Sequence, residues 1–280
     1  MEYFCTINVN GRLLSLDEPV VMGILNVTPD SFYSSSRVTG DTLVERAEGM
    51  IEAGAKILDI GACSTRPGTA FTSFPSKEEE LRALHSALEL LDKELPDAVV
   101  SIDTFRGDVA LECAGEHNVS IINDVSGFDW DSSMFDAVCK LRLPYVLTHS
   151  PAEPGGAVEY EHFVPGVMKH LAQKMWQLHQ EGVADIIVDP GFGFGKSLEQ
   201  NYELFGAMKE MSLLEAPLLV GISRKSMITK LLGLDAASAL PGTVALNMAA
   251  LDRGAKVLRV HDVPEAVHVV ELWKAINRNI

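Results

Sequence analysis

The sequence predicts one α/β domain, a (β/α)8 TIM barrel over residues 1–280 that begins with a β-hairpin at residues 1–17. Eight short apolar segments recur at steps of about 34 residues, enough chain for a strand, a loop and a helix each time. The segments between them carry apolar residues at helical spacing, and no Pro- or Ser-rich linker divides the chain. Eight successive strand and helix units are typical of a closed barrel.

The N-terminal hairpin is predicted from a turn signal between two short apolar segments. Thr6–Val9 and Leu13–Leu16 flank Asn10 and Gly11, and an Asn-Gly pair accepts the left-handed backbone of a type I′ turn. We expect this hairpin to cover the bottom of the barrel, where the strands begin.

The eight predicted barrel strands are continuous apolar segments, and this pattern favours a parallel sheet that is covered on both faces. They are Val20–Asn26, Ile57–Gly61, Val99–Asp103, Ser120–Asp124, Tyr145–His149, Ile186–Asp189, Leu218–Ile222 and Val257–Val260.

Each predicted strand is followed by a segment with the apolar spacing of an amphipathic helix. In one of these segments Leu81, Leu84, Leu88 and Leu91 fall on one helix face. The predicted helices are Asp41–Ala53, Lys77–Leu95, Gly107–Glu116, Asp131–Leu141, Phe163–Glu181, Leu198–Met211, Thr243–Arg253 and Pro264–Asn277.

Charge and cysteine content exclude several classes of protein. With 39 acidic and 23 basic residues the net charge is −16, which argues against a nucleic-acid binder. An anionic substrate must therefore be held by a few local cations, helix N-termini or a metal. The four cysteines form no C-x-x-C pair, and the sequence carries neither a leader-like start nor a membrane-length apolar segment. We expect a cytoplasmic protein with free thiols.

Polar residues follow the predicted strands, where a barrel places its chemistry. One group, Asp103, Asn123, Asp189 and Lys225, offers donors and acceptors suited to a flat heterocycle. Because an ionised buried carboxylate is costly unless paired, Asp189 should face N–H donors or Lys225.

A second group suits an anion such as diphosphate. It consists of the cations Arg66, Arg259 and His261, with Asn26 as an oxygen ligand for a metal. Arg259 and His261 are two positions apart on a strand, so both should point to the same side, towards the interior. The Gly-rich residues 191–195 match neither a Walker loop nor a dinucleotide fingerprint, which excludes both nucleotide-binding classes.

Several separate motifs at these residues resemble the dihydropteroate synthase family of folate biosynthesis across nearly the whole chain. The motifs are Gly23–Phe32, Ser64–Gly68, Asp189–Lys196, Ser223–Ser226 and Arg259–Asp262. The resemblance implies that p-aminobenzoate is joined to a dihydropterin diphosphate with release of diphosphate and assistance from Mg²⁺. It also implies a homodimer formed through outer helices.

The resemblance also implies residue functions. Asp103, Asn123, Asp189 and Lys225 would hold the pterin, with Phe194 beside them, and Asn26 would hold Mg²⁺. The diphosphate would be bound by Arg66, Arg259 and His261 and supported by Thr65, while Phe32, Pro67 and Ser226 border the p-aminobenzoate site. Arg66, Lys225, Arg259 and His261 are the expected catalytic residues, acting in a dissociative substitution without a covalent enzyme intermediate.

The sequence differs from the family pattern in its loops. Tyr33–Ser36 stands where members commonly carry an acid followed by glycines, and Gly61–Cys63 replaces a Gly-Gly-Glu or Gly-Gly-Gln sequence. The first difference keeps open a non-catalytic pterin-binding paralogue. A pterin-dependent methyltransferase is the other alternative, although it would need no anion site at Arg66 and Arg259.

Overall fold

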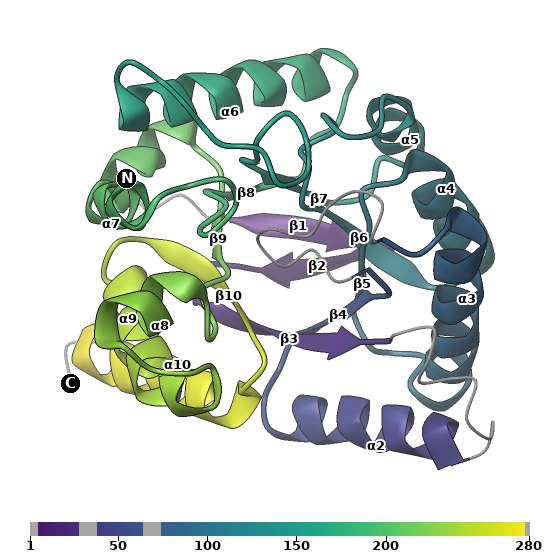
Figure 1. Cartoon of the computed structure of the whole chain (residues 1–280). Coiled ribbons are helices and arrows are strands. Elements are labelled where there is room, and N and C mark those ends of the chain that lie inside the picture. The colour runs from purple at the N-terminus through teal and green to yellow at the C-terminus, as the bar shows by residue number, and fades with distance from the viewer. Residues whose placement is uncertain (1–4, 28–37, 64–73, 278–280) are drawn as a thin grey trace.

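The computed structural model describes residues 5–27, 38–63 and 74–277 (Figure 1). Eight parallel strands close into a barrel in the order β10-β3-β4-β5-β6-β7-β8-β9, which confirms the predicted fold. The strands are β3 (Val20–Asn26), β4 (Ile57–Gly61), β5 (Val100–Asp103), β6 (Val119–Asp124), β7 (Tyr145–Thr148), β8 (Ile186–Asp189), β9 (Leu218–Val220) and β10 (Ala255–Val260).

Helices surround the strands as an outer ring in Figure 1. In the described residues they are α2 (Val38–Glu52), α3 (Lys77–Glu94), α4 (Gly107–Glu116), α5 (Ser133–Leu141), α6 (Phe163–Gln180), α7 (Leu198–Gly206), α8 (Ser226–Leu232), α9 (Leu240–Leu251) and α10 (Val263–Asn277), with 3-10 helices η2 (Met208–Leu214) and η3 (Ala237–Ala239). None of these helices is by itself long and apolar enough to cross a membrane, whereas the bent pair of α8 with η3 and α9 passes that test by length and composition alone.

One predicted helix is divided in the structure, and one helix was not predicted. The segment predicted as one helix from Leu198 to Met211 is α7 followed by η2, with a break after Gly206. The sequence analysis also missed α8, which has only seven residues and ends at Gly233 with φ +65°. Two turns are too short to establish a helical period.

The N-terminal hairpin pairs β1 (Thr6–Val9) with β2 (Arg12–Ser15) in antiparallel register. Asn10 and Gly11 both have positive φ, 52° and 82°, as the predicted turn requires. The hairpin side chains Ile7, Val9 and Leu16 pack with apolar residues inside the barrel, so the prediction that the hairpin covers its bottom is confirmed.

The barrel interior is divided into an apolar lower layer and a polar upper layer. The lower layer packs against the hairpin and consists of Val20, Met22, Ile57, Ile121, Val146, Ile187, Leu219 and Val257. Side chains alternate along a strand, so the next interior position lies two residues further on. On β4, β8 and β10 that position holds Asp59, Asp189 and Arg259. The interior therefore changes from apolar to charged within one step towards the carboxyl ends of the strands.

Candidate active site at the carboxyl end of the barrel

Asp59 is the most deeply buried carboxylate of the upper layer, with no exposed surface. Its oxygens accept hydrogen bonds from Ser101 Oγ at 2.7 Å, Asn123 Nδ2 at 3.0 Å and Arg259 Nε at 2.6 Å. Three donors from three other strands thus satisfy one aspartate. Asp59 therefore orients both Asn123, of the predicted ring group, and Arg259, of the predicted anion group.

Arg259 bridges Asp59 to a second carboxylate, Asp103 at the end of β5, with 2.5 Å between Nη2 and Oδ2. Burial raises the pKa of Asp103, although Arg259 opposes that shift. Burial also works against the charge of Arg259, but Asp59 and Asp103 raise its pKa above the usual range. The guanidinium therefore stays charged and is already paired with two carboxylates, a pairing that the sequence analysis did not predict.

Asp189 ends β8 and is 6% exposed. Its Oδ1 accepts the backbone N–H of Gly191 at 2.8 Å. Burial raises the pKa of Asp189, while Lys225 and the Gly191 N–H favour its ionised form. The prediction that Asp189 faces N–H donors or Lys225 is confirmed.

Lys225 immediately precedes α8 and points back towards the β8 loop. Its Nζ donates to the carbonyl oxygen of Phe192 at 2.7 Å and lies 4.3 Å from the ring centroid of Phe194. Burial lowers the pKa of Lys225 to about 8. The ammonium and an aromatic face thus lie next to each other, an arrangement that suits a flat polar ring.

The two predicted groups share one site. A Cβ placed on Gly221 would lie 3.9 Å from Asp189 Oδ2 and 3.9 Å from Arg259 Cδ, so these side chains flank the same glycine. A larger residue at 221 would extend between them. The structure therefore brings Arg259, of the predicted anion group, together with all four residues of the predicted ring group, Asp103, Asn123, Asp189 and Lys225.

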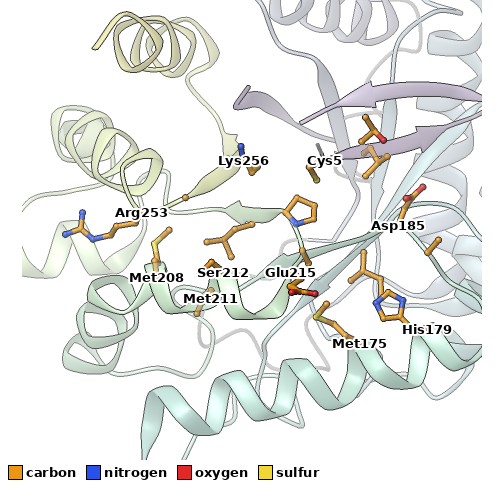
Figure 2. Close-up of a pocket in the computed structure, with 18 residues that line it drawn as sticks. Cys5, Met175, His179, Asp185, Met208, Met211, Ser212, Glu215, Arg253 and Lys256 are labelled. Atoms are coloured by element: carbon orange, nitrogen blue, oxygen red, sulfur yellow. The ribbon is translucent and has the colours of Figure 1, made fainter. Parts of the chain in front are cut away.

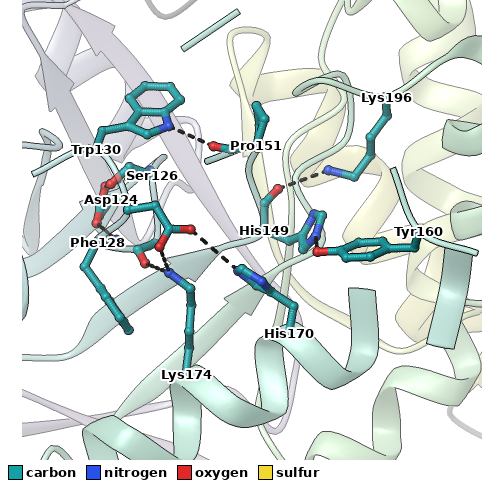
Figure 3. Close-up of polar contacts among 12 residues, drawn as sticks. Asp124, Ser126, Phe128, Trp130, His149, Pro151, Tyr160, His170, Lys174 and Lys196 are labelled. Carbon is teal, nitrogen blue, oxygen red and sulfur yellow. Dashed lines mark hydrogen bonds and ion pairs between the residues drawn. The ribbon is translucent and has the colours of Figure 1, made fainter. Parts of the chain in front are cut away.

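The Gly-rich loop after β8 is held against the end of β7. Lys196 Nζ donates to the carbonyl oxygens of His149, Gly191 and Phe194 at 3.0, 2.7 and 3.2 Å, and Figure 3 shows the first of these bonds. A Cβ on Gly191 would meet the His149 oxygen at 1.9 Å, and φ there is +68°. Only glycine permits this close approach. The glycine at 191 therefore serves the path of the loop.

Further buried polar contacts connect the loops after β6 and β7 (Figure 3). Lys174 of α6 donates to the Gly127 carbonyl and to Asp129 Oδ1, the latter at 2.6 Å. His149 Nε2 lies 3.1 Å from the hydroxyl of Tyr160. Lys174 thus fixes the loop after β6 to α6, and the His149–Tyr160 contact lies within the loop after β7.

Three other predicted residues lie at the same end with fewer described contacts. Asn26 is exposed at the last position of β3, and Ser226 is the first residue of α8. His261 follows the last residue of β10 and is exposed, with its Nδ1 3.0 Å from Ser223 Oγ. Arg259 points inward as predicted, whereas His261 lies beyond the strand. Phe32, Thr65, Arg66 and Pro67 lie outside the described residues.

Asp59 and Ser101 were given no function from the sequence. In the structure Asp59 accepts hydrogen bonds from Asn123 and Arg259, and Ser101 donates to Asp59. A signal was present: both are polar residues inside otherwise apolar strands. Asp59 is two positions after the interior residue Ile57, so the period of two predicts that it points inward.

A separate cavity of about 470 Å³ lies at the opposite end of the barrel (Figure 2). Its lining includes Cys5 of the hairpin segment, Asp185 before β8, Pro217 before β9 and Lys256 near the start of β10. These are the amino ends of the strands, where residues of a barrel contribute to stability and not to chemistry. The cavity is thus distinct from the polar site.

The fold and site define a (β/α)8 barrel with buried carboxylates and cations clustered at the carboxyl ends of its strands. Residues 22–261 match a family described as "Pterin binding enzyme". The dihydropteroate synthase of Escherichia coli (strain K12) is 38% identical over 275 residues, covering 95% of this chain and 94% of that protein. The Haemophilus influenzae dihydropteroate synthase is 35% identical over 272 residues, covering 95% and 97%.

Solved structures of dihydropteroate synthases have the same fold as this chain. Dihydropteroate synthase from Xanthomonas albilineans with 4-aminobenzoic acid superposes with a TM-score of 0.88 at 36% identity, covering 99% of this chain and 100% of that one. The same enzyme in complex with 7,8-dihydropteroate gives 0.86 at 34% identity, with the same coverage. The chain belongs to the dihydropteroate synthase family, and it is a transferase.

Proposed function

We propose that the protein joins p-aminobenzoate to 6-hydroxymethyl-7,8-dihydropterin diphosphate, forming 7,8-dihydropteroate and diphosphate. The observation that carries this proposal is the cluster of Asp189, Lys225 and Arg259, in which Asp189 and Arg259 flank Gly221 and Lys225 lies close enough to favour the ionised form of Asp189. The Xanthomonas albilineans relative has been solved with 4-aminobenzoic acid and with 7,8-dihydropteroate, which supports the same substrate and product here.

The pterin would be recognised by complementary hydrogen bonds. The Asp189 carboxylate would accept from the amino-pyrimidine N–H groups, and the Lys225 ammonium would donate to a ring oxygen or nitrogen. Asn123 is 5% exposed and held by Asp59, so its amide can present a fixed donor and acceptor to the ring edge. Phe194, beside Lys225, would contact the ring face.

The chemical step would be dissociative. Loss of diphosphate leaves a cation on the pterin methylene, and the weakly basic aryl amine then attacks it. Asp59 and Asp103, both paired with Arg259, would favour a neighbouring cation. Arg259, His261 and Arg66 would bind the leaving diphosphate.

Asn26 suits the implied Mg²⁺. Its side chain is exposed at the carboxyl end of β3, and an amide oxygen is a ligand that Mg²⁺ accepts. Mg²⁺ is commonly held by one or two protein groups together with water and substrate phosphates, so a single exposed Asn at the mouth fits. When bound there, the ion would neutralise charge developing on the diphosphate.

We further propose a cytoplasmic homodimer. All four cysteines are free thiols, in keeping with a reducing compartment. Leu231, Leu232 and Leu234, at and after the end of α8, are 55%, 53% and 40% exposed, and such an apolar edge is suited to a subunit contact. Sedimentation of the purified chain should give twice the monomer mass, and Leu231→Glu should lower it.

The experiment that tests the catalytic proposal is release of diphosphate from the pterin diphosphate in the presence of p-aminobenzoate and Mg²⁺. We expect stoichiometric dihydropteroate, strict dependence on p-aminobenzoate and loss of the reaction with EDTA. Pterin binding without turnover would instead identify a non-catalytic paralogue, and methyl transfer from a methylated folate would identify the methyltransferase alternative.

A further inference from the structure

A cluster of histidine and carboxylate side chains lies between the outer helices α3 and α4, apart from the catalytic mouth. His85 belongs to α3, Glu116 is the last residue of α4 and His117 follows it. Their side chains are 26%, 64% and 11% exposed, so solvent ions can reach the cluster. The proposed function uses none of these residues.

Both imidazole rings are oriented by carboxylates on their outer sides. His85 Nε2 lies 3.3 Å from Glu112 Oε1, and His117 Nδ1 lies 2.8 Å from Asp92 Oδ2. The second Asp92 oxygen accepts the backbone N–H of Asn118 at 3.1 Å, which fixes this carboxylate. A carboxylate behind each ring makes the outer nitrogen the natural N–H donor.

The two inner nitrogens then both need a partner that accepts their lone pairs. His85 Nδ1 and His117 Nε2 are 2.8 Å apart, and a neutral imidazole with its N–H on the outer nitrogen presents a lone pair at the inner one. Two lone pairs facing each other repel. A positive centre held by both nitrogens removes that repulsion, and Glu116 supplies a third donor 3.8 Å from His85 Nδ1.

We propose that His85 Nδ1, His117 Nε2 and the Glu116 carboxylate bind a divalent transition metal of the zinc class, with water as the fourth ligand. The three donor atoms lie within 4.8 Å of one another. Tetrahedral zinc bonds of about 2.0–2.2 Å require donor separations of roughly 3.3 Å, which small side-chain rotations provide.

The donor set and the charge favour zinc over magnesium or calcium. Two imidazole nitrogens suit zinc, whereas the hard cations select oxygen ligands. Asp92, Glu112 and Glu116 place negative charge around the two rings, which a dication balances. The site would connect α3 to α4 and stabilise the outer wall of the barrel.

The test is titration of the metal-free full-length protein with Zn²⁺ by calorimetry, with unfolding temperature as a second measurement. We expect one Zn²⁺ per chain and a rise in unfolding temperature with Zn²⁺. His85→Gln and His117→Gln should each abolish this binding. Asp92→Asn should weaken it by roughly ten- to a hundredfold, as loss of an outer carboxylate does. His268→Gln, at an exposed histidine of α10, is the matched control and should bind like wild type.

Cobalt distinguishes this site from adventitious binding by cysteine. Co²⁺ in the wild-type protein should give tetrahedral visible bands without a thiolate charge-transfer band. Zn²⁺ affinity that survives in His85→Gln, a thiolate band, or no shift of the unfolding temperature would overturn the proposal and leave only a proton shared between the rings. If His117→Gln does not fold, His85→Gln and the wild-type measurements decide the question.

Discussion

The lower and upper layers of the barrel interior are built on the same strands, but the lower layer stabilises the fold and the upper layer holds the polar groups of the site. On β8, Ile187 is 1% exposed and packs with the hairpin, while Asp189, two residues on, is a buried carboxylate beside Lys225. The lower layer gains free energy from apolar burial, at about 1.5–3 kcal/mol for a large side chain. In the upper layer, the ion pairs only partly offset the free-energy cost of removing their charged groups from water. Stability and binding should therefore respond separately to substitutions in the two layers.

Arg259→Met gives the largest expected effect, because it leaves Asp59 and Asp103 buried without their cation. The free energy of unfolding should fall by about 3–5 kcal/mol at pH 7. Losing Arg259 raises the pKa of Asp103 further, so the native state binds a proton that the unfolded chain releases, and stability falls as pH rises. Because burial already raises the pKa of Asp103 to about 7 in the wild type, urea unfolding should show a smaller loss at pH 5 than at pH 8.5.

The control for this prediction is Arg12→Met at the opposite end, where Arg12 is 51% exposed and its partner Asp97 is 98% exposed. That pair should contribute less than about 1 kcal/mol. An equal loss from Arg259→Met at both pH values would contradict the electrostatic explanation.

A matched pair on β8 tests the separation of the layers directly. Asp189→Ala, like Lys225→Ala, should weaken pterin binding by about 2–5 kcal/mol because each leaves an opposite charge buried and unpaired. Ile187→Ala should instead lower the free energy of unfolding by about 2–5 kcal/mol and leave pterin affinity near that of wild type. Calorimetric binding and urea unfolding of all three variants would measure this.

Weaker pterin binding in Ile187→Ala would contradict the separation of the two layers. Wild-type pterin affinity in both Asp189→Ala and Lys225→Ala would show that the ring pocket lies elsewhere.

The pH dependence of Lys225 separates binding from stability within a single residue. Burial lowers its pKa in the folded protein from 10.5 to about 8, so the ammonium, which we propose donates to pterin, is present below about pH 8. Pterin affinity should fall as pH rises through that value. Because the native state releases this proton before the unfolded state does, the contribution of Lys225 to stability should rise between pH 8 and 10.5.

Binding and unfolding measured from pH 6.5 to 9.5 would check both directions. In Lys225→Arg the decline in affinity near pH 8 should disappear, since a guanidinium does not titrate there. A decline that persists in this variant would assign it to another group.

Gly11→Ala gives the smallest expected effect. Gly11 has φ +82° in the hairpin turn, and no atom lies within 4 Å of the added Cβ, so the cost is backbone strain alone. The free energy of unfolding should fall by about 1–2 kcal/mol, with pterin affinity unchanged. Reduced pterin affinity would show that the hairpin turn affects the site at the opposite end of the barrel.

Local pattern predicted most of the fold. The bounds of β3, β4 and β8 coincide with the predictions, because each is a short, predominantly apolar segment. Local pattern did not predict α8, because the polar motif Ser223–Ser226 leads directly into a helix of only two turns. Asp103, Asn123 and Asp189, at or next to the ends of β5, β6 and β8, were identified from their position, whereas β7 and β9 end one and two residues earlier than predicted.

By itself, then, the sequence determined the alternation of strand and helix, the hairpin turn and the polar residues that reach the mouth, since these depend on neighbours a few positions away. Only the tertiary structure decided the partners. Asp59 and Arg259 are 200 residues apart and become hydrogen-bonded because barrel closure places β10 next to β3. The same closure places Asp189 and Arg259 on either side of Gly221. Contacts between distant segments follow from packing, which no local period encodes.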